Sequence, residues 1–220
     1  MAGWRRAFRQ GGRLLTRART PGAWLPRLRR ALFWSRPLNA AEWALLTRYF
    51  GQPPHPGWAR MRLHLRRLGD TRRALSFNGG FVSMPASCFT GSDPRQCLRL
   101  DEPLMAGWLA HEAFHHWQRL QGRAVTRQAL HLQWRFWRHG INPYAYTPGE
   151  SPAALLAQFQ HAQVEQQAQM WQDAVMADIA WRQAAPGADQ QRLAAAAQRW
   201  HAVLHWVQMQ AVPPPAPLVP

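Results

Sequence analysis

The chain has 220 residues, of which 47% are hydrophobic, and this length and apolar content suffice for one folded domain with a sizeable core. They exclude a chain that is disordered throughout, and no apolar run approaches the roughly 20 residues that a membrane span requires. The formal net charge is +16, because 27 basic residues, all of them arginine, face only 11 acids.

The arginines are concentrated at the N-terminus. Ten of them fall within residues 1–41, and no acid precedes Glu42. We therefore expect residues 1–37 to form a basic flexible arm, either solvated or adsorbed to a nucleic acid or an anionic membrane. Its longest apolar run, residues 31–34, is shorter than the roughly 7–15 residues in the core of a secretory signal. This predicts a protein that is cytoplasmic when made.

The first folded element is predicted to be a helix that begins near residue 39. Asn39 is a favourable N-cap, Glu42 completes a capping box, and Gly51 suits the position after the last turn. Residues 61–66 then alternate between apolar and polar side chains, which is the pattern of a half-buried strand.

A β-hairpin is predicted around Asn78-Gly79, which separates two β-prone segments. Pro85 ends the second of these segments. We expect the hairpin to belong to a small antiparallel sheet. We also expect residues 80–85 to offer a free edge along which an extended peptide could bind.

The two cysteines, Cys88 and Cys97, flank a stretch that can turn the chain back on itself. Gly91, Asp93 and Pro94 are the turn-forming residues between them. The sequence leaves two alternatives open, a disulfide in an oxidising compartment or two free thiols in a reducing one.

From residue 101 onward the sequence is predominantly helical. Capping residues and helix breakers predict helices over residues 101–121, 126–140, 151–183 and 189–210. We expect four regions in the whole chain: the basic arm (1–37), a folded domain (38–185), a C-terminal amphipathic helix (186–210) and a Pro-rich tail (211–220).

The clearest chemical pattern is WLAHEAFHHWQ, residues 108–118. On a helix, His111 and His115 lie one turn apart on the same face and can bind one metal ion, while Glu112 lies beside them. Zinc accepts neutral imidazoles and activates a water molecule, from which Glu112 would take a proton. The alternative is an amphipathic helix with incidental polar residues, because the motif is short. His116 points elsewhere and is expected to support or pack.

A third zinc ligand must come from another part of the chain. The helix predicted after residue 151 offers Glu165, about 50 residues after the histidine pair, as the ligand of a gluzincin-type site. His161 on the same face is the rival ligand. Asp173 could instead orient a zinc-bound imidazole. Without the histidine motif, Glu165 would be read as a solvated helix residue.

The segments LAHEAFHHWQ, YAYTPG and FQHAQVEQQAQ resemble the zincin-like Vgr-related proteins linked to type VI secretion. More distantly, they are similar to the peptidase-like core domain found beside extracellular contractile injection systems. Gln118 and residues 165–168 occupy the places of the His-Glu-x-x-His-x-x-Gln and Glu-Gln-Gln-Ala motifs. The resemblance covers about residues 37–178. Phe114 stands where the family has Thr or Ser, and His116 where it has an aliphatic residue.

The resemblance implies a mainly helical α+β, zincin-like (gluzincin-type) fold with zinc on His111, His115 and Glu165. Glu112 would be the catalytic base. Tyr144 and Tyr146 lie in the matching YAY stretch, where a hydroxyl could stabilise the oxyanion; packing the wall of the site is the alternative.

The implied function is a bacterial zinc metallopeptidase or amidase that acts as a type VI secretion effector. Its partners would be a peptide or peptidoglycan substrate and a spike or immunity protein of that system, with export to a target cell or periplasm. One alternative is a non-catalytic accessory or carrier protein with a zincin-like fold. Another is a surface-binding module built on the basic arm.

Overall fold

The computed structural model describes residues 35–51, 56–66, 73–77, 80–91 and 97–210. The chain separates into two units, Met1–Trp34 and Ser35–Pro220, and the fold below is that of the second unit. The predicted basic arm, except its last three residues, the Asn78-Gly79 turn and the Pro-rich tail lie outside the described residues.

The described residues form six α-helices and a four-stranded sheet, which confirms the predicted mainly helical α+β class. The strands are β1 (Ser35–Pro37), β2 (Arg62–Arg66), β3 (Leu75–Phe77) and β4 (Phe81–Pro85). The helices are α2 (Ala40–Phe50), α3 (Pro103–Leu120), α4 (Val125–His139), α5 (Pro152–His161), α6 (Val164–Gln183) and α7 (Ala188–Met209). Two short 3₁₀ helices, η2 (Pro56–Arg60) and η3 (Ala86–Cys88), complete the set.

The sheet has the order β1-β2-β4-β3 and is mixed rather than wholly antiparallel. Strands β3 and β4 pair antiparallel as the predicted hairpin, but β2 and β4 pair parallel. Strand β4 therefore lies inside the sheet. The prediction that residues 80–85 form a free edge is wrong, because β2 and β3 occupy both sides of β4. Strand β3 is the terminal strand on that side.

Local signals predicted the first helix and the second strand correctly in position. Asn39 accepts a hydrogen bond from the Glu42 backbone while the Glu42 side chain accepts from the Asn39 backbone, so the capping box is confirmed. Strand β2 occupies the predicted place. It is not half-buried as predicted, because the polar residues His64 and Arg66 are buried together with Leu63 and Leu65. A hydrogen bond of 3.3 Å joins His64 to Ser83 on β4.

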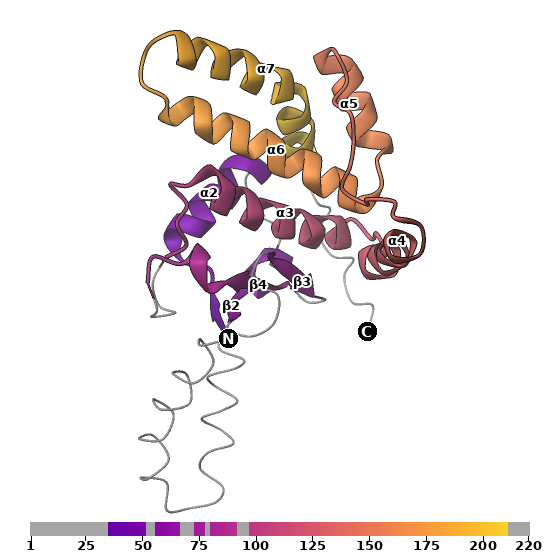
Figure 1. The fold of residues 1–220 in the computed structure, drawn as a ribbon. Coiled ribbons are helices and arrows are strands. Elements are labelled where there is room, and N and C mark those ends of the chain that lie inside the picture. Colours follow the sequence, from indigo (N-terminus) through magenta and orange to yellow (C-terminus); the bar gives the residue numbers. More distant parts are fainter. Residues whose placement is uncertain (1–34, 52–55, 67–72, 78–79, 92–96, 211–220) are drawn as a thin grey trace, which may run out of the picture. The chain divides into compact units, whose positions relative to one another are not determined.

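Helix α3 lies between the sheet and α6, and α6 in turn packs against α7 (Figure 1). The close approach of α3 to α6 depends on Gly107, since a Cβ there would lie 2.6 Å from the Met176 side chain. Phe114 is fully buried between the two helices, with its ring 5.5 Å from that of Trp171 and 5.6 Å from that of Phe159. Phe114 thus serves the core.

The helix predicted over 151–183 is two helices. It breaks at residues 162–163, because Ala162 and Gln163 are extended and a capping box between Gln163 and Gln166 starts α6. As a result Glu165 lies in the first turn of α6 and not in mid-helix.

The cysteine loop closes through its backbone and not through sulfur. Residues Phe89 and Leu98 form an antiparallel bridge, but Cys88 and Cys97 are free; the former is buried and the latter exposed. Of the two alternatives left open by the sequence, the structure has the free thiols. No helix in the described ranges combines the length and the apolarity needed to cross a bilayer.

Candidate metal centre

His111, His115 and Glu165 form a buried cluster at the contact of α3 with α6. One ligand atom from each residue lies within 4.8 Å of the others. The two histidines share a face of α3, as their spacing predicts, and their ring centroids are 4.9 Å apart. Glu165 reaches them from the first turn of α6.

The spacing of these atoms fits a zinc ion. Two ligand atoms bound to one zinc at about 2.1 Å and a tetrahedral angle lie about 3.4 Å apart. Oε2 of Glu165 is 3.2 Å from Nε2 of His115 and 3.7 Å from Nε2 of His111. Two imidazole nitrogens and one carboxylate oxygen are also the donor set of a catalytic zinc site, which leaves a fourth position for water.

The hydrogen bonds around His115 strengthen this fit. The amide nitrogen of Gln118 donates to the Val164 carbonyl and to Gln167, so its oxygen faces Nδ1 of His115 at 3.0 Å. Nδ1 must therefore carry a proton, which leaves the lone pair of a neutral ring on Nε2, opposite the Glu165 carboxylate. Two acceptors at 3.2 Å require a positive group between them, either a proton or a metal ion.

The electrostatics of the metal-free cluster follow from this geometry. Burial opposes charge on His115, but the Glu165 and Glu112 carboxylates prevail and raise its pKa. Burial likewise opposes charge on Glu165, but hydrogen bonds from His111 and His115 hold the pKa of its carboxyl well below the usual range. The cluster thus favours an anion facing a cation, and zinc can replace the proton as that cation.

A chain of amide hydrogen bonds joins α3 to α5 and to the start of α6. Gln167 is buried and donates 2.7 Å to the Phe159 carbonyl, while its oxygen accepts from both Gln118 and Arg123. Because Gln118 also holds His115, this chain links the last turn of α5 to one residue of the cluster. Nδ1 of His111 has no hydrogen-bond partner among the described residues, so packing orients that ring.

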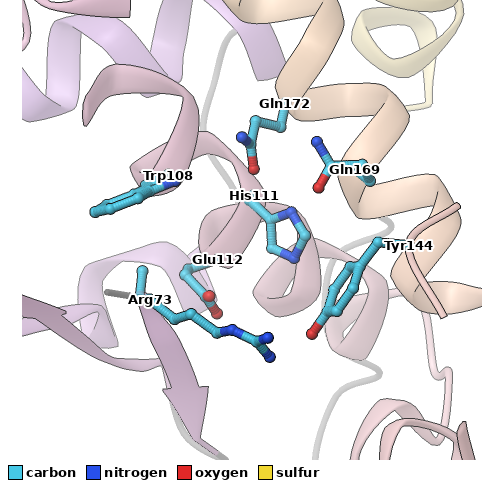
Figure 2. Close-up of a pocket in the computed structure, with 8 residues that line it drawn as sticks. Arg73, Trp108, His111, Glu112, Tyr144, Gln169 and Gln172 are labelled. Atoms are coloured by element: carbon cyan, nitrogen blue, oxygen red, sulfur yellow. The ribbon is translucent and has the colours of Figure 1, made fainter. Parts of the chain in front are cut away.

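Glu112 and His111 line two adjoining cavities of about 230 and 320 Å³. Figure 2 shows His111 between Gln169 and Gln172 of α6 on one side and Glu112 on the other. Glu112 is buried but faces the same space as the metal ligands. It lies beside the three residues of the cluster and is not one of them.

Further residues that line the cavities carry no signal in the sequence. They include Arg73, Trp108, Arg119, Gln169 and Gln172. Arg73 precedes β3, and its guanidinium lies 6.0 Å from the centre of the Tyr144 ring (Figure 2). In the sequence Arg73 follows another arginine, and no motif distinguishes it until the fold brings it to the site.

The two tyrosines of the YAY stretch point in different directions. Tyr144 lines both cavities, with its ring 6.1 Å from that of His111. Burial and the Glu165 carboxylate raise the pKa of Tyr144 to about 12, so its hydroxyl remains a proton donor at neutral pH. Tyr146 instead donates to Asp173 and packs against Trp200, and it is not among the residues that line the cavities.

The other candidate residues lie outside the cluster. His161 is exposed at the end of α5, so it is not the third member. Asp173 holds Tyr146 and Gln169, and the role expected for it beside an imidazole falls to Gln118. His116 contacts the Gly57 carbonyl at 3.1 Å, which agrees with the expectation that it does not share a metal with His111.

Two imidazoles, one carboxylate, a neighbouring glutamate and an open cavity together provide what metal-dependent hydrolysis requires. No family model, no curated protein and no solved structure matches this chain, so the conclusion rests on the geometry of the site.

Proposed function

We propose that this protein is a zinc-dependent peptidase or amidase. The observation that carries the proposal is the buried cluster of His111, His115 and Glu165 beside Glu112, at the wall of an open cavity. Zinc is preferred because its usual catalytic ligands are neutral imidazole and carboxylate, and because Oε2 of Glu165 lies near tetrahedral spacing from Nε2 of both histidines.

His111, His115 and Glu165 would hold the ion, which when bound supplies Lewis acidity and lowers the pKa of water to about 7. A carboxylate oxygen of Glu112 would accept a proton from the attacking water, and Glu112 would then pass this proton to the leaving amine. Tyr144 would donate a hydrogen bond to the carbonyl oxygen as negative charge develops there. Gln118 would keep the proton on Nδ1 of His115.

The substrate would bind as an extended strand along β3. Leu75 and Ser76 of β3 line the same cavity as Glu112 and His115, and β3 is one of the two terminal strands of the described sheet. The backbone groups on its outer side can pair with a peptide and hold a peptide bond across the ligands. Strand β3 thus takes the place of the edge expected at residues 80–85.

The proposal extends to the context that the family resemblance implies. We propose that the substrate is a protein or a peptidoglycan peptide, and that the protein acts as an effector of type VI secretion. The support for the secretion context is the match of residues 109–118 and 165–168 to the family motifs. A non-catalytic accessory protein with the same cluster is the second candidate, because ligands can persist where activity is lost.

Hydrolysis by the zinc-loaded protein, measured on a peptide library and on peptidoglycan fragments, tests the proposal. We expect wild-type protein to cleave and Glu112→Gln to lose about 10²–10⁴-fold in turnover at equal zinc content. Glu150→Gln is the matched control, since Glu150 is exposed and outside the set of cavity-lining residues. Equal cleavage by wild type and Glu112→Gln contradicts the base assignment. Full zinc content without cleavage supports the accessory role.

A further inference from the structure

Helix α4 presents an exposed apolar surface next to the cavity. Only Val125 and Leu132 of this helix are buried. Leu130, Trp134 and Trp137 are 66%, 54% and 91% exposed, whereas large apolar side chains are usually covered. Such a cluster on a folded protein marks a surface that binds something.

The exposed residues form one stripe. Positions 130, 134 and 137 follow the i, i+4, i+7 spacing that places side chains on a single helix face. Phe136 and Ile141, the latter just after the helix, are also exposed. Leu130 additionally lines the larger cavity beside Glu112. We call Leu130, Trp134 and Trp137 the α4 stripe.

One side of the α4 stripe is basic. At 100° per residue, Arg127, His131 and Arg138 follow the stripe along its flank, and Arg135 lies just beyond them. Helix α4 contains no acid. Arg127, His131 and Arg135 also line a hollow of about 440 Å³, which has room and charge for a phosphate group.

We infer that α4 docks this protein on an anionic lipid surface. An interfacial helix combines an apolar face containing Trp and Leu with a polar face rich in Lys or Arg, which is the arrangement of α4. Trp134 and Trp137 would enter the boundary between headgroups and acyl chains, where indole rings are favoured. The arginines on the flank would extend to lipid phosphates.

Other occupants fit this surface less well. A second copy that packed stripe against stripe would bring the arginines of both α4 helices together, with no acid on either helix to pair with them. A nucleic acid would stack on the indoles but would leave Leu130 against a charged backbone. A lipid surface satisfies both the apolar and the basic parts of α4.

Docking through α4 has a consequence for the cavity. Because Leu130 belongs to both surfaces, docking would hold the mouth of the cavity beside the lipid headgroups. Substrates attached to or lying at a membrane would then be favoured. This consequence rests on the proposed function, whereas docking itself needs neither zinc nor hydrolysis.

The test is partition of the full chain into vesicles, measured by co-sedimentation with phosphatidylcholine vesicles that contain or lack 30% phosphatidylglycerol. We expect binding to the anionic vesicles and at least a tenfold loss of partition for Trp134→Gln/Trp137→Gln. These substitutions leave the charge unchanged, so any attraction from residues 1–37 is the same in both proteins. Met209→Gln, which removes an apolar side chain 68% exposed on α7, should not change partition.

The single variant Trp137→Gln controls for misfolding of the double variant, because a side chain that is 91% exposed contributes little to the core. It should lose partition several-fold while zinc content and melting temperature stay the same. Equal partition of wild type and both variants overturns the inference. A concentration-dependent dimer that the variants abolish also overturns the inference, because it identifies a second copy as the occupant. Variants that lose binding to single-stranded DNA but still bind vesicles overturn it as well, because they identify a nucleic acid.

Discussion

Nε2 of His115 and Oε2 of Glu165 lie 3.2 Å apart although 50 residues separate them in the chain. The contact exists because α3 and α6 pack closely at Gly107 and because a capping box starts α6 just before Glu165. The other ring nitrogen of His115 is held by Gln118. This pair joins the two helices at the candidate metal site.

Purified protein should contain about one zinc ion per chain by elemental analysis. The His111→Ala/His115→Ala double variant and Glu165→Ala should each lose it, because two ligands or fewer rarely retain zinc. His161→Ala is the control, since this exposed histidine lies outside the cluster. Unchanged zinc in the double variant, or zinc loss only in His161→Ala, contradicts the assignment.

Removal of metal with a chelator should give a pH-dependent stability. The raised pKa of His115 stabilises the metal-free fold below the unfolded value of about 6.5, and this contribution is lost as the pH rises through the folded value. The lowered pKa of Glu165 stabilises the metal-free fold above the unfolded value of about 4.3, and this contribution is lost as the pH falls through the folded value.

The melting temperature of metal-free protein relative to its Glu165→Gln variant should therefore be greatest between about pH 4.5 and 6.5. With zinc bound, the melting temperature should instead rise with pH above about 6.5, because zinc binds neutral imidazole and protons compete with it. Thermal melts from pH 4 to 8, with and without zinc, measure both trends. A difference that does not vary with pH would show that the two side chains are not coupled as a charged pair.

Gln118→Leu should weaken zinc binding about 10–100-fold, since groups that orient a metal-bound histidine typically contribute this much. The reason is that Nδ1 of His115 loses its acceptor. Gln118→Glu keeps an acceptor and should recover part of the affinity. Gln183→Leu on the exposed end of α6 is the control. Competition with a chelating dye measures the affinities, and equal values for Gln118→Leu and wild type contradict the role of Gln118.

Tyr144→Phe should lower kcat at least tenfold with little change in KM, since the hydroxyl acts on the developing charge and not on the bound substrate. With a pKa of about 12, Tyr144 remains a donor throughout the neutral range. Tyr146→Phe should instead leave turnover unchanged and reduce stability by about 1–2 kcal/mol, because it loses its bond to Asp173. Steady-state kinetics measure the effect on turnover, and denaturant melts measure the effect on stability. If Tyr146→Phe lowered kcat and Tyr144→Phe lowered only stability, the two assigned roles would be exchanged.

Cys97 should react with a thiol reagent in the folded protein, and Cys88 should react only after unfolding. Burial raises the pKa of the Cys88 thiol to about 12, so almost no thiolate forms at neutral pH. Cys97 is exposed, with its sulfur 3.2 Å from the Asn39 amide. Mass spectrometry of labelled peptides checks both residues. Two residues that stay unlabelled until a reductant is added would show a disulfide.

The sequence by itself determined the features that depend on neighbours along the chain. The i, i+4 spacing placed His111 and His115 on one face, and the Asn39–Glu42 capping box fixed the start of α2. The Asn78-Gly79 signal predicted the pairing of β3 with β4. These features require only backbone periodicity and local hydrogen bonds, which residue types a few positions apart specify.

Only the tertiary structure decided which of several chemically equivalent residues meet. Strand β2 lies between β1 and β4, which closes the edge expected at residues 80–85 and makes β3 a terminal strand of the sheet that the described residues form. One expected helix became two at residues 162–163, where Gln118 of α3 donates to the Val164 carbonyl and Gln167 donates to the Phe159 carbonyl. Tyr144 and Tyr146 are two residues apart, but Tyr144 lines a cavity whereas Tyr146 donates a hydrogen bond to Asp173. Such choices depend on long-range packing of α3 against α6, where burial and shape select a single arrangement.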